Sequence, residues 1–178
     1  MRKLLLLSGG MDSSLCLYKV PGIELCVGFD YGQPHVIELD YAKEIATACG
    51  VEFRRVGIPK MPRIDDAVFP ARNAVLLSMA ASIAVSQNLD AIVIGCNMSD
   101  AARFPDCRDE FIAEIGKALS VYGVSVLAPL LAMTKADILS EARSFGIPST
   151  WTCYQPNGKL PCGECYACLG LENARVQS

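Results

Sequence analysis

The sequence predicts an α/β fold, a parallel five-stranded sheet with helices on both faces. Two observations support this prediction. Short apolar runs alternate with segments in which apolar residues recur at helical spacing, as in consecutive βαβ units. The run at residues 91–95 is apolar throughout, which is typical of a parallel strand that is buried on both faces.

Five strands and five helices follow from this pattern. The predicted strands span residues 3–7, 24–29, 52–56, 91–95 and 124–127. The predicted helices begin before residue 15 and span about 37–48, 73–88, 109–119 and 135–145. Gly50 has the position of a glycine just past a helix end, and Thr134 that of an N-cap. A loop punctuated by Pro59, Pro62 and Pro70 separates the third strand from the next helix.

Composition narrows the class of protein. The 178 residues suffice for one domain, or one domain with a small appendage, and 52% of them are apolar. The formal net charge of −3 argues against direct binding of nucleic acid. No segment is apolar over a length that spans a membrane, and the N-terminal leucines are too few for a signal peptide. An odd count of nine cysteines argues against a disulfide framework, so we expect a cytoplasmic protein.

The loop after the first predicted strand has the composition of an anion-binding turn. Residues 8–14 read Ser-Gly-Gly-Met-Asp-Ser-Ser and lead into a helix, whose first N–H groups can bind phosphate. The hydroxyls of Ser8, Ser13 and Ser14 can donate to phosphate oxygens, and Asp12 can hold Mg²⁺. The spacing is that of neither a Walker A loop nor a dinucleotide-binding loop. An ordinary helix N-cap is the alternative interpretation.

Chemically distinctive loops also follow the second and fourth predicted strands, at residues 30–35 and 96–108. In a parallel sheet, the carboxyl ends of the strands meet at one edge, where ligands bind. The sequence therefore predicts a single site at that edge.

Four cysteines near the C-terminus form a predicted zinc knuckle. Cys153 is followed by Cys162, Cys165 and Cys168 at C-x-x-C spacing, with Gly163 in the first turn. Four thiolates satisfy one tetrahedral zinc ion, which makes the predicted zinc structural. A redox dithiol and an iron–sulfur cluster are the alternatives.

The motifs, read together, resemble those of the QueC family, the 7-cyano-7-deazaguanine (preQ0) synthases of the PP-loop ATP pyrophosphatase superfamily. The matching strings, in order, are SGGMDSS, DYGQPHVIEL, PARNAVLLSMA, IGCNMSDAARFPDCRDEFI, APLLAMTKADI and TCY followed by the cysteine cluster. The resemblance implies a PP-loop fold of the adenine nucleotide alpha hydrolase-like type. It also implies a PP-loop ATP-binding and substrate domain at 1–150, on which a four-cysteine zinc-binding segment at 151–178 packs.

The resemblance implies an ATP-dependent carbon–nitrogen ligase of queuosine biosynthesis. Such an enzyme converts 7-carboxy-7-deazaguanine and ammonia to 7-cyano-7-deazaguanine, adenylating first the acid and then the amide and releasing AMP and pyrophosphate. The implied cofactors are ATP, Mg²⁺ and zinc. A homodimer is compatible with the weakly charged helix near residues 73–88.

The same resemblance assigns roles to residues. Catalytic roles fall to Asp12, Lys135 and Arg72. ATP binding is assigned to Ser8, Gly9, Gly10, Met11, Asp12, Ser13 and Ser14. Substrate binding is assigned to Tyr31, Gln33, His35, Arg72, Asn73, Asn97, Asp100, Phe104, Asp106 and Arg108, and metal binding to Cys153, Cys162, Cys165 and Cys168. Plainer roles compete with these: a solvated lysine at a helix start, a structural loop arginine and a structural histidine.

The chain departs from the family pattern at Pro34, Ala71 and residues 102–104, where family members usually have arginine, glycine and Ser-Gly-Tyr.

Three alternative functions accompany the main prediction. One is a related adenylating ligase that stops at the amide or uses another amine. The others are a tRNA-thiolation enzyme and a non-catalytic, zinc-stabilised nucleotide-binding module.

Overall fold

The computed structural model describes residues 1–60 and 69–177. Five parallel strands form one sheet in the order β3-β2-β1-β4-β5. The strands are β1 Lys3–Leu6, β2 Ile23–Asp30, β3 Glu52–Gly57, β4 Ala91–Val93 and β5 Ser125–Leu127. The helices are α1 Met11–Lys19, α2 Glu38–Ala48, α3 Arg72–Ser86, α4 Met98–Ala101, α5 Asp109–Ser120, α6 Lys135–Ser144 and α7 Tyr166–Gln177, with a 3₁₀ turn η1 at Pro105–Cys107.

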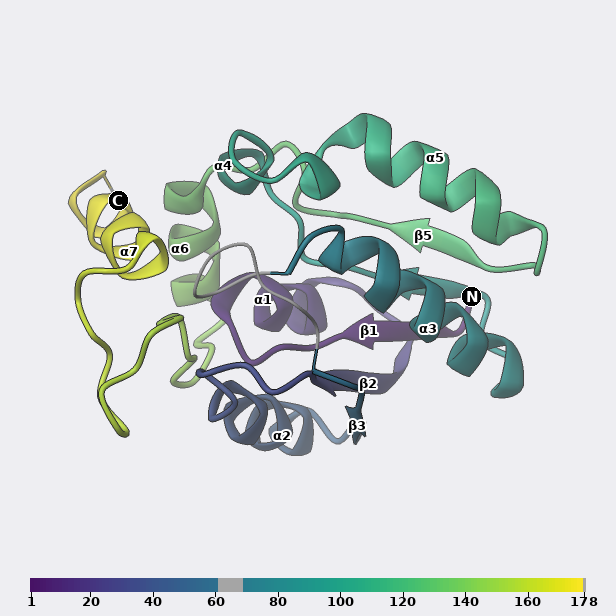
Figure 1. Cartoon of the computed structure of the whole chain (residues 1–178), viewed down its shortest axis with the longest axis horizontal. Coiled ribbons are helices and arrows are strands. Elements are labelled where there is room, and N and C mark those ends of the chain that lie inside the picture. Colours follow the sequence, from purple (N-terminus) through teal and green to yellow (C-terminus); the bar gives the residue numbers. More distant parts are fainter. Residues whose placement is uncertain (61–68, 178) are drawn as a thin grey trace.

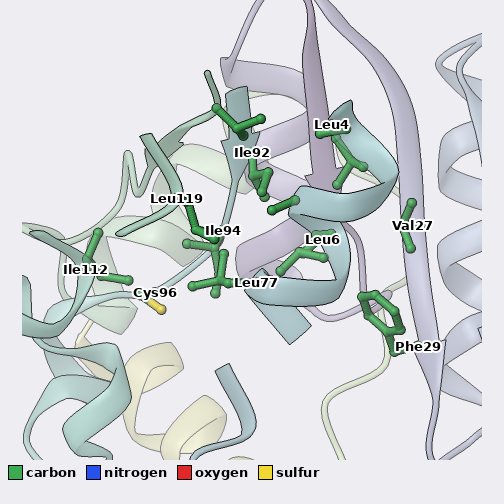
Figure 2. Packing of buried hydrophobic residues seen from close by; sticks show 14 of the residues in the cluster. Leu4, Leu6, Val27, Phe29, Leu77, Ile92, Ile94, Cys96, Ile112 and Leu119 are labelled. Carbon is green, nitrogen blue, oxygen red and sulfur yellow. The ribbon is translucent and has the colours of Figure 1, made fainter. Parts of the chain in front are cut away.

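Alternation along β1 divides the core into two layers. Leu4 and Leu6 pack on one face, against α3 and α5, while Leu5 and Leu7 pack on the other, against α1, α2 and α6. Figure 1 shows α3 in front of the sheet and α5 alongside β5. Figure 2 shows Leu77 of α3 close to Leu6 and Ile94 in the first layer. Because helices cover both faces of β1 and β4, almost every side chain of these central strands is buried, and their sequences are continuous apolar runs.

The predicted strands and helices are confirmed, with ends that differ by a few residues. Gly50 lies just past α2 with φ +69°, and Asn88 takes the same left-handed conformation, φ +53°, two residues past α3. Thr134 caps α6 in a reciprocal capping box with Asp137. The apolar spacing of the sequence did not predict α4, η1 or α7. The loop predicted around Pro62 lies partly in residues 61–68, outside the described residues.

The order of the strands creates a switch point between β1 and β4. The chain builds outward from β1 to β3, then returns through α3 to form β4 on the opposite side of β1. In such sheets the connections diverge at the switch point and leave room for a ligand at the carboxyl ends. The loops after β1 and β4 meet there: a Cβ on Gly95 would lie 2.9 Å from the backbone nitrogen of Ser13.

None of the helices formed by the described residues combines the length and the apolar character that crossing a bilayer requires.

Candidate active site

Residues 8–14 form a tight turn between β1 and α1. Gly9 has φ +86°, and a Cβ there would lie 2.0 Å from the carbonyl oxygen of Glu38. Only glycine allows this close approach in this backbone conformation. The hydroxyls of Ser13 and Ser14 donate to the carbonyl of Gly10, at 3.1 and 2.7 Å, so they hold the turn in shape.

The N-terminus of α1 is not capped by a side chain. Gly10 is the N-cap residue and provides no side-chain oxygen, and the first intrahelical bond runs from the N–H of Ser14 to Gly10. The preceding N–H groups of the first turn therefore lack an intrahelical acceptor. The N-terminus of α6, by contrast, is closed by its capping box. The end of α1 thus has free N–H groups of the kind that can bind an anion.

Lys135, the first residue of α6, faces this turn. Its ammonium lies 2.8 and 2.5 Å from the two carboxylate oxygens of Asp12. Burial lowers the pKa of Lys135, but the carboxylates of Asp12 and Asp100 outweigh burial and raise that pKa to about 12. The ammonium stays charged throughout the neutral range, so Lys135 is suited to bind phosphate as a point charge.

Two adjoining cavities open around the turn. One, of about 160 Å³, lies over the ends of β1, β2 and β4, and its wall includes Tyr31, Glu38 and Arg72. The other, of about 430 Å³, lies between the turn, the start of α6 and α7, and its wall includes Lys135 and Tyr166. Both walls contain Ser8, Gly10, Asp12, Asp100 and Tyr154. The uncapped N-terminus of α1 therefore lies at the junction of two cavities. Their combined size is that of a small-molecule site.

A carboxyl group and a guanidinium group are buried together in the smaller cavity. Burial raises the pKa of Glu38 to about 8, against the opposing effects of Arg72 and of the hydrogen bond from Gln33. Burial alone would lower the pKa of Arg72, but Tyr31, Tyr154 and Glu38 raise it, and its Nη1 lies 3.4 Å from the hydroxyl of Tyr31. The guanidinium remains a cation in the cavity wall. Burial also raises the pKa of Asp100, against the opposing effect of Lys135.

Asn73 joins the start of α3 to the loop after β4. Its backbone N–H donates to a carboxylate oxygen of Asp106 at 2.9 Å, and its side-chain amide donates to the Asp106 carbonyl at 2.9 Å. The same amide lies 3.4 Å from the sulfur of Cys107. Asn73 lines the smaller cavity, whereas the carboxylate of Asp106 is engaged in holding α3.

The structure brings only some of the predicted substrate residues to the cavities. Tyr31, Arg72, Asn73 and Asp100 line them. The remaining predicted residues lie behind the walls or outside them: Gln33, His35, Asn97, Phe104, Asp106 and Arg108. Gln33 is buried and its amide donates to the Phe29 carbonyl. The carboxamide of Asn97 caps α4, and the guanidinium of Arg108 donates to the carbonyl of Ala101.

His35 is buried next to the smaller cavity. Its Nδ1 lies 3.0 Å from the carbonyl oxygen of Tyr154, which can only accept, so Nδ1 carries the proton. Its Nε2 lies 3.6 Å from a carboxylate oxygen of Glu38. This histidine therefore links the start of α2 to the cysteine-rich segment.

The sulfurs of Cys153, Cys162, Cys165 and Cys168 lie within 4.8 Å of one another. A tetrahedral zinc with bonds of about 2.3 Å would hold four sulfurs roughly 3.8 Å apart, so the cluster suits one ion. In a [4Fe–4S] cluster, each cysteine binds a different iron atom at a corner of the cluster. The four cysteine sulfurs must then lie farther apart than they do around one zinc ion. Backbone N–H groups point at the sulfurs, as from Cys162 to Cys153 at 3.2 Å and from Cys165 to Cys162 at 3.3 Å. Such donors stabilise the thiolates that bind a metal.

Two residues of the cavity walls, Glu38 and Tyr154, were not singled out in the sequence analysis. Both lie inside strings that were, DYGQPHVIEL and TCY. Two local features could have indicated them. Glu38 lies three residues after the single histidine, and Tyr154 lies next to a predicted metal ligand. The wall formed by α7 was missed because α7 was not predicted.

The chain matches the family model described as "Queuosine biosynthesis protein QueC" over residues 2–68 and 61–176. A 7-cyano-7-deazaguanine synthase of Myxococcus xanthus is 36% identical, over 98% of this chain and 94% of that protein. One of Leptospira interrogans is 33% identical, over 94% and 84%. These alignments span 217 and 202 positions, more than the 178 residues here, so both relatives contain residues that this chain lacks.

Solved structures agree on the fold. A U34-tRNA thiolase, NcsA, of Methanococcus maripaludis has a TM-score of 0.63 at 16% identity, covering 99% of this chain and 65% of that one. An NH3-dependent NAD synthetase of Campylobacter jejuni has a TM-score of 0.54 at 16% identity, covering 82% and 64%. At this identity the likeness shows the PP-loop-like architecture alone.

Proposed function

The chain belongs to the QueC family, and from this membership we propose that it is an ATP-dependent 7-cyano-7-deazaguanine synthase, an enzyme that forms carbon–nitrogen bonds. The substrates are 7-carboxy-7-deazaguanine, ammonia and ATP. The observation that carries this proposal is the uncapped N-terminus of α1 at the junction of two cavities. That arrangement lets a nucleotide lie on one side of the phosphate-binding turn and an acceptor on the other.

A carboxylate is a poor electrophile, and transfer of AMP converts it into an acyl adenylate with a good leaving group. In the first half-reaction, a carboxylate oxygen of the substrate attacks the α-phosphorus of ATP and pyrophosphate leaves. The N–H groups at the start of α1 bind the phosphate oxygens, and Lys135 offsets their charge. Ammonia then attacks the acyl carbon, and AMP leaves to give the amide.

The second half-reaction repeats the activation on the amide oxygen. A second ATP adenylates that oxygen, and loss of AMP with two N–H protons leaves the nitrile. Arg72, buried with Glu38 in the smaller cavity, supplies a fixed positive charge beside the reacting groups. Mg²⁺ would neutralise phosphate charge in both halves, and Asp12 is the carboxylate of the junction that would hold it.

Asp100 is the carboxylate best placed to bind the N–H edge of the deazaguanine. It lines both cavities, whereas the carboxylate of Asp106 is already bonded to the N–H of Asn73. Tyr31, at the end of β2, provides an aromatic surface in the smaller cavity.

The metal that fits the four cysteines is zinc, bound as a structural ion because protein ligands fill all four positions. It would fasten the segment that contains Trp151 and Tyr154 to the start of α7. We retain the predictions of a segment division at residue 150, a cytoplasmic location, no direct binding of nucleic acid, and a homodimer.

One assay tests this function. The purified protein is incubated with ATP, MgCl2, 7-carboxy-7-deazaguanine and ammonium chloride, and AMP and the mass of the product are followed together. We expect AMP release that depends on the acid, and a product with the nitrile mass. A product that stays at the amide mass would identify the related ligase instead. AMP release that does not require the acid contradicts both reactions.

A further inference from the structure

Tyr154 lies where the two cavities meet. Five residues line both, and Tyr154 is the only aromatic residue among them. The hydroxyl of Ser8, the other hydroxyl shared by both walls, is engaged with Ser13 and with the N–H of Gly10. Tyr154 therefore offers a hydroxyl-bearing side chain to both cavities.

The backbone of Tyr154 holds it in place, which leaves its hydroxyl available. Its N–H donates to the sulfur of Cys165 at 3.5 Å, and its carbonyl accepts from Nδ1 of His35 at 3.0 Å. The rings of Tyr154 and His35 lie 5.1 Å apart between centroids. With the described residues, the hydrogen bonds of Tyr154 use these backbone groups and not the phenol oxygen.

Two cations lie close to the phenol. Tyr154 interacts electrostatically with the guanidinium of Arg72 in one cavity and with the ammonium of Lys135 in the other. Arg72 and Lys135 can therefore both stabilise negative charge that develops beside the phenol. A neutral hydroxyl near them adds a directed hydrogen-bond donor, which two point charges do not supply.

We propose that Tyr154 is a catalytic residue whose hydroxyl donates a hydrogen bond to the phosphoryl oxygen that gains charge during adenylation. This inference rests on the proposed function. As the acceptor oxygen bonds to the α-phosphorus and the bond to the departing pyrophosphate breaks, charge grows on the non-bridging oxygens at the junction. Tyr154 keeps its proton throughout, so no proton or electron is transferred to it.

The four-cysteine cluster then has a second purpose. Cys153 precedes Tyr154 directly, and the sulfur of Cys165 accepts its N–H, so the cluster positions a residue of the reaction centre. The cluster thereby links the metal-binding segment to catalysis as well as to stability.

The test compares Tyr154→Phe with Tyr41→Phe in the full-length, metal-containing protein. Tyr41 of α2 packs against Trp151 of the same segment, with ring centroids 5.6 Å apart, but lines neither cavity. Substrate-dependent release of pyrophosphate gives kcat and KM for ATP, and metal content and thermal unfolding are measured in parallel. Removal of one donor to a developing charge typically lowers kcat about 100-fold. We expect that loss for Tyr154→Phe, with KM, metal content and Tm close to wild type, and no loss for Tyr41→Phe.

The outcomes separate the two proposals. If the wild-type protein forms no AMP with the acid, the proposed function fails and this inference fails with it. If the wild type is active and Tyr154→Phe keeps kcat within threefold, only this inference is wrong. A Tyr154→Phe protein that loses activity together with metal or thermal stability also overturns it, because the residue then acts through the fold.

Discussion

Lys135 and Asp12 form an ion pair, with the ammonium 2.8 and 2.5 Å from the two carboxylate oxygens, across 123 residues of sequence. Each lies in the first turn of a helix, α6 and α1, and these two helices pack side by side on the same face of the sheet. The pair therefore places a cation and a carboxylate together at the uncapped N-terminus of α1.

Replacement of either partner of this pair should abolish activity without unfolding the protein. We expect Asp12→Asn and Lys135→Met each to lower AMP release at least about 100-fold, because both act on phosphate charge. The double variant should be little worse than either single one, since the two residues act as a unit. AMP release by the three variants and the wild type, measured at saturating ATP, checks this.

Lys19→Met is the matched control, because Lys19 of α1 also pairs with a residue of α6, Glu141, at 2.5 Å. That pair is remote from both cavities, so its loss should leave AMP release unchanged. Activity of Lys135→Met within threefold of wild type would mean that the Lys135–Asp12 pair is only structural.

Cys165→Ser should release the bound metal and lower the free energy of unfolding. The free energy of metal binding, on the order of 10 kcal/mol in zinc-finger peptides, stabilises the folded state of such sites because the unfolded chain does not hold the metal. Elemental analysis and chemical denaturation measure the two effects, and Cys49→Ser, outside the cluster, is the control. Iron in place of zinc in the wild-type protein would contradict the zinc assignment.

Stability should depend on the ionisation of Glu38. Burial raises its pKa from 4.5 to about 8, so between these values the folded state holds a proton that the unfolded state has lost. The free energy of unfolding therefore falls as pH rises through this window, and the contribution is greatest below pH 4.5. Relative to Glu38→Gln, which does not titrate, the wild type should lose about 2 to 4 kcal/mol between pH 5 and 8.

Denaturation of both proteins at pH 5, 6.5 and 8 checks this prediction. The comparison keeps Arg72 in place and retains an amide at position 38. Parallel pH curves for the two proteins would show that Glu38 has an ordinary pKa in the fold.

Ala71→Gly should stabilise the protein. Ala71 is the N-cap of α3 and has φ +53°, a left-handed conformation that costs a residue with a Cβ about 1 kcal/mol or more. Glycine removes that cost, so we expect the free energy of unfolding to rise by about 1 kcal/mol. The same substitution at Ala74, inside α3, should instead lower it by about 1 kcal/mol. A destabilised Ala71→Gly protein would contradict this reading of the backbone.

Local pattern was enough to predict the elements of the fold. The strands and five of the helices follow from apolar spacing, and Thr134 and Gly50 mark ends that the structure retains. The helix α7 escaped prediction because its residues show no clear apolar stripe and begin inside the cysteine cluster. The short α4 depends on the side chain of Asn97, a cap that only the folded loop reveals.

The composition of the site was predictable, but not its layout. The residues of the turn at 8–14 are contiguous and the four cysteines nearly so, and their spacing was enough to predict the chemistry proposed for each. Asp100 and Asp106 looked equivalent in one loop, and the fold distinguishes them because Asp106 accepts the N–H of Asn73. Glu38 becomes a buried acid only in the fold, where Gln33 and His35 contact its carboxyl group and the start of α2 packs against Gly9.

The sequence by itself determined which segments are strands, which turn has the composition expected of an anion site and which thiols form a potential metal-binding cluster, because each depends on residues close together in the chain. Tertiary structure decided the strand order, the meeting of Lys135 with Asp12 and the position of Tyr154 between two cavities. These relationships join segments about a hundred residues apart. They arise from packing helices onto a sheet, which no local pattern encodes.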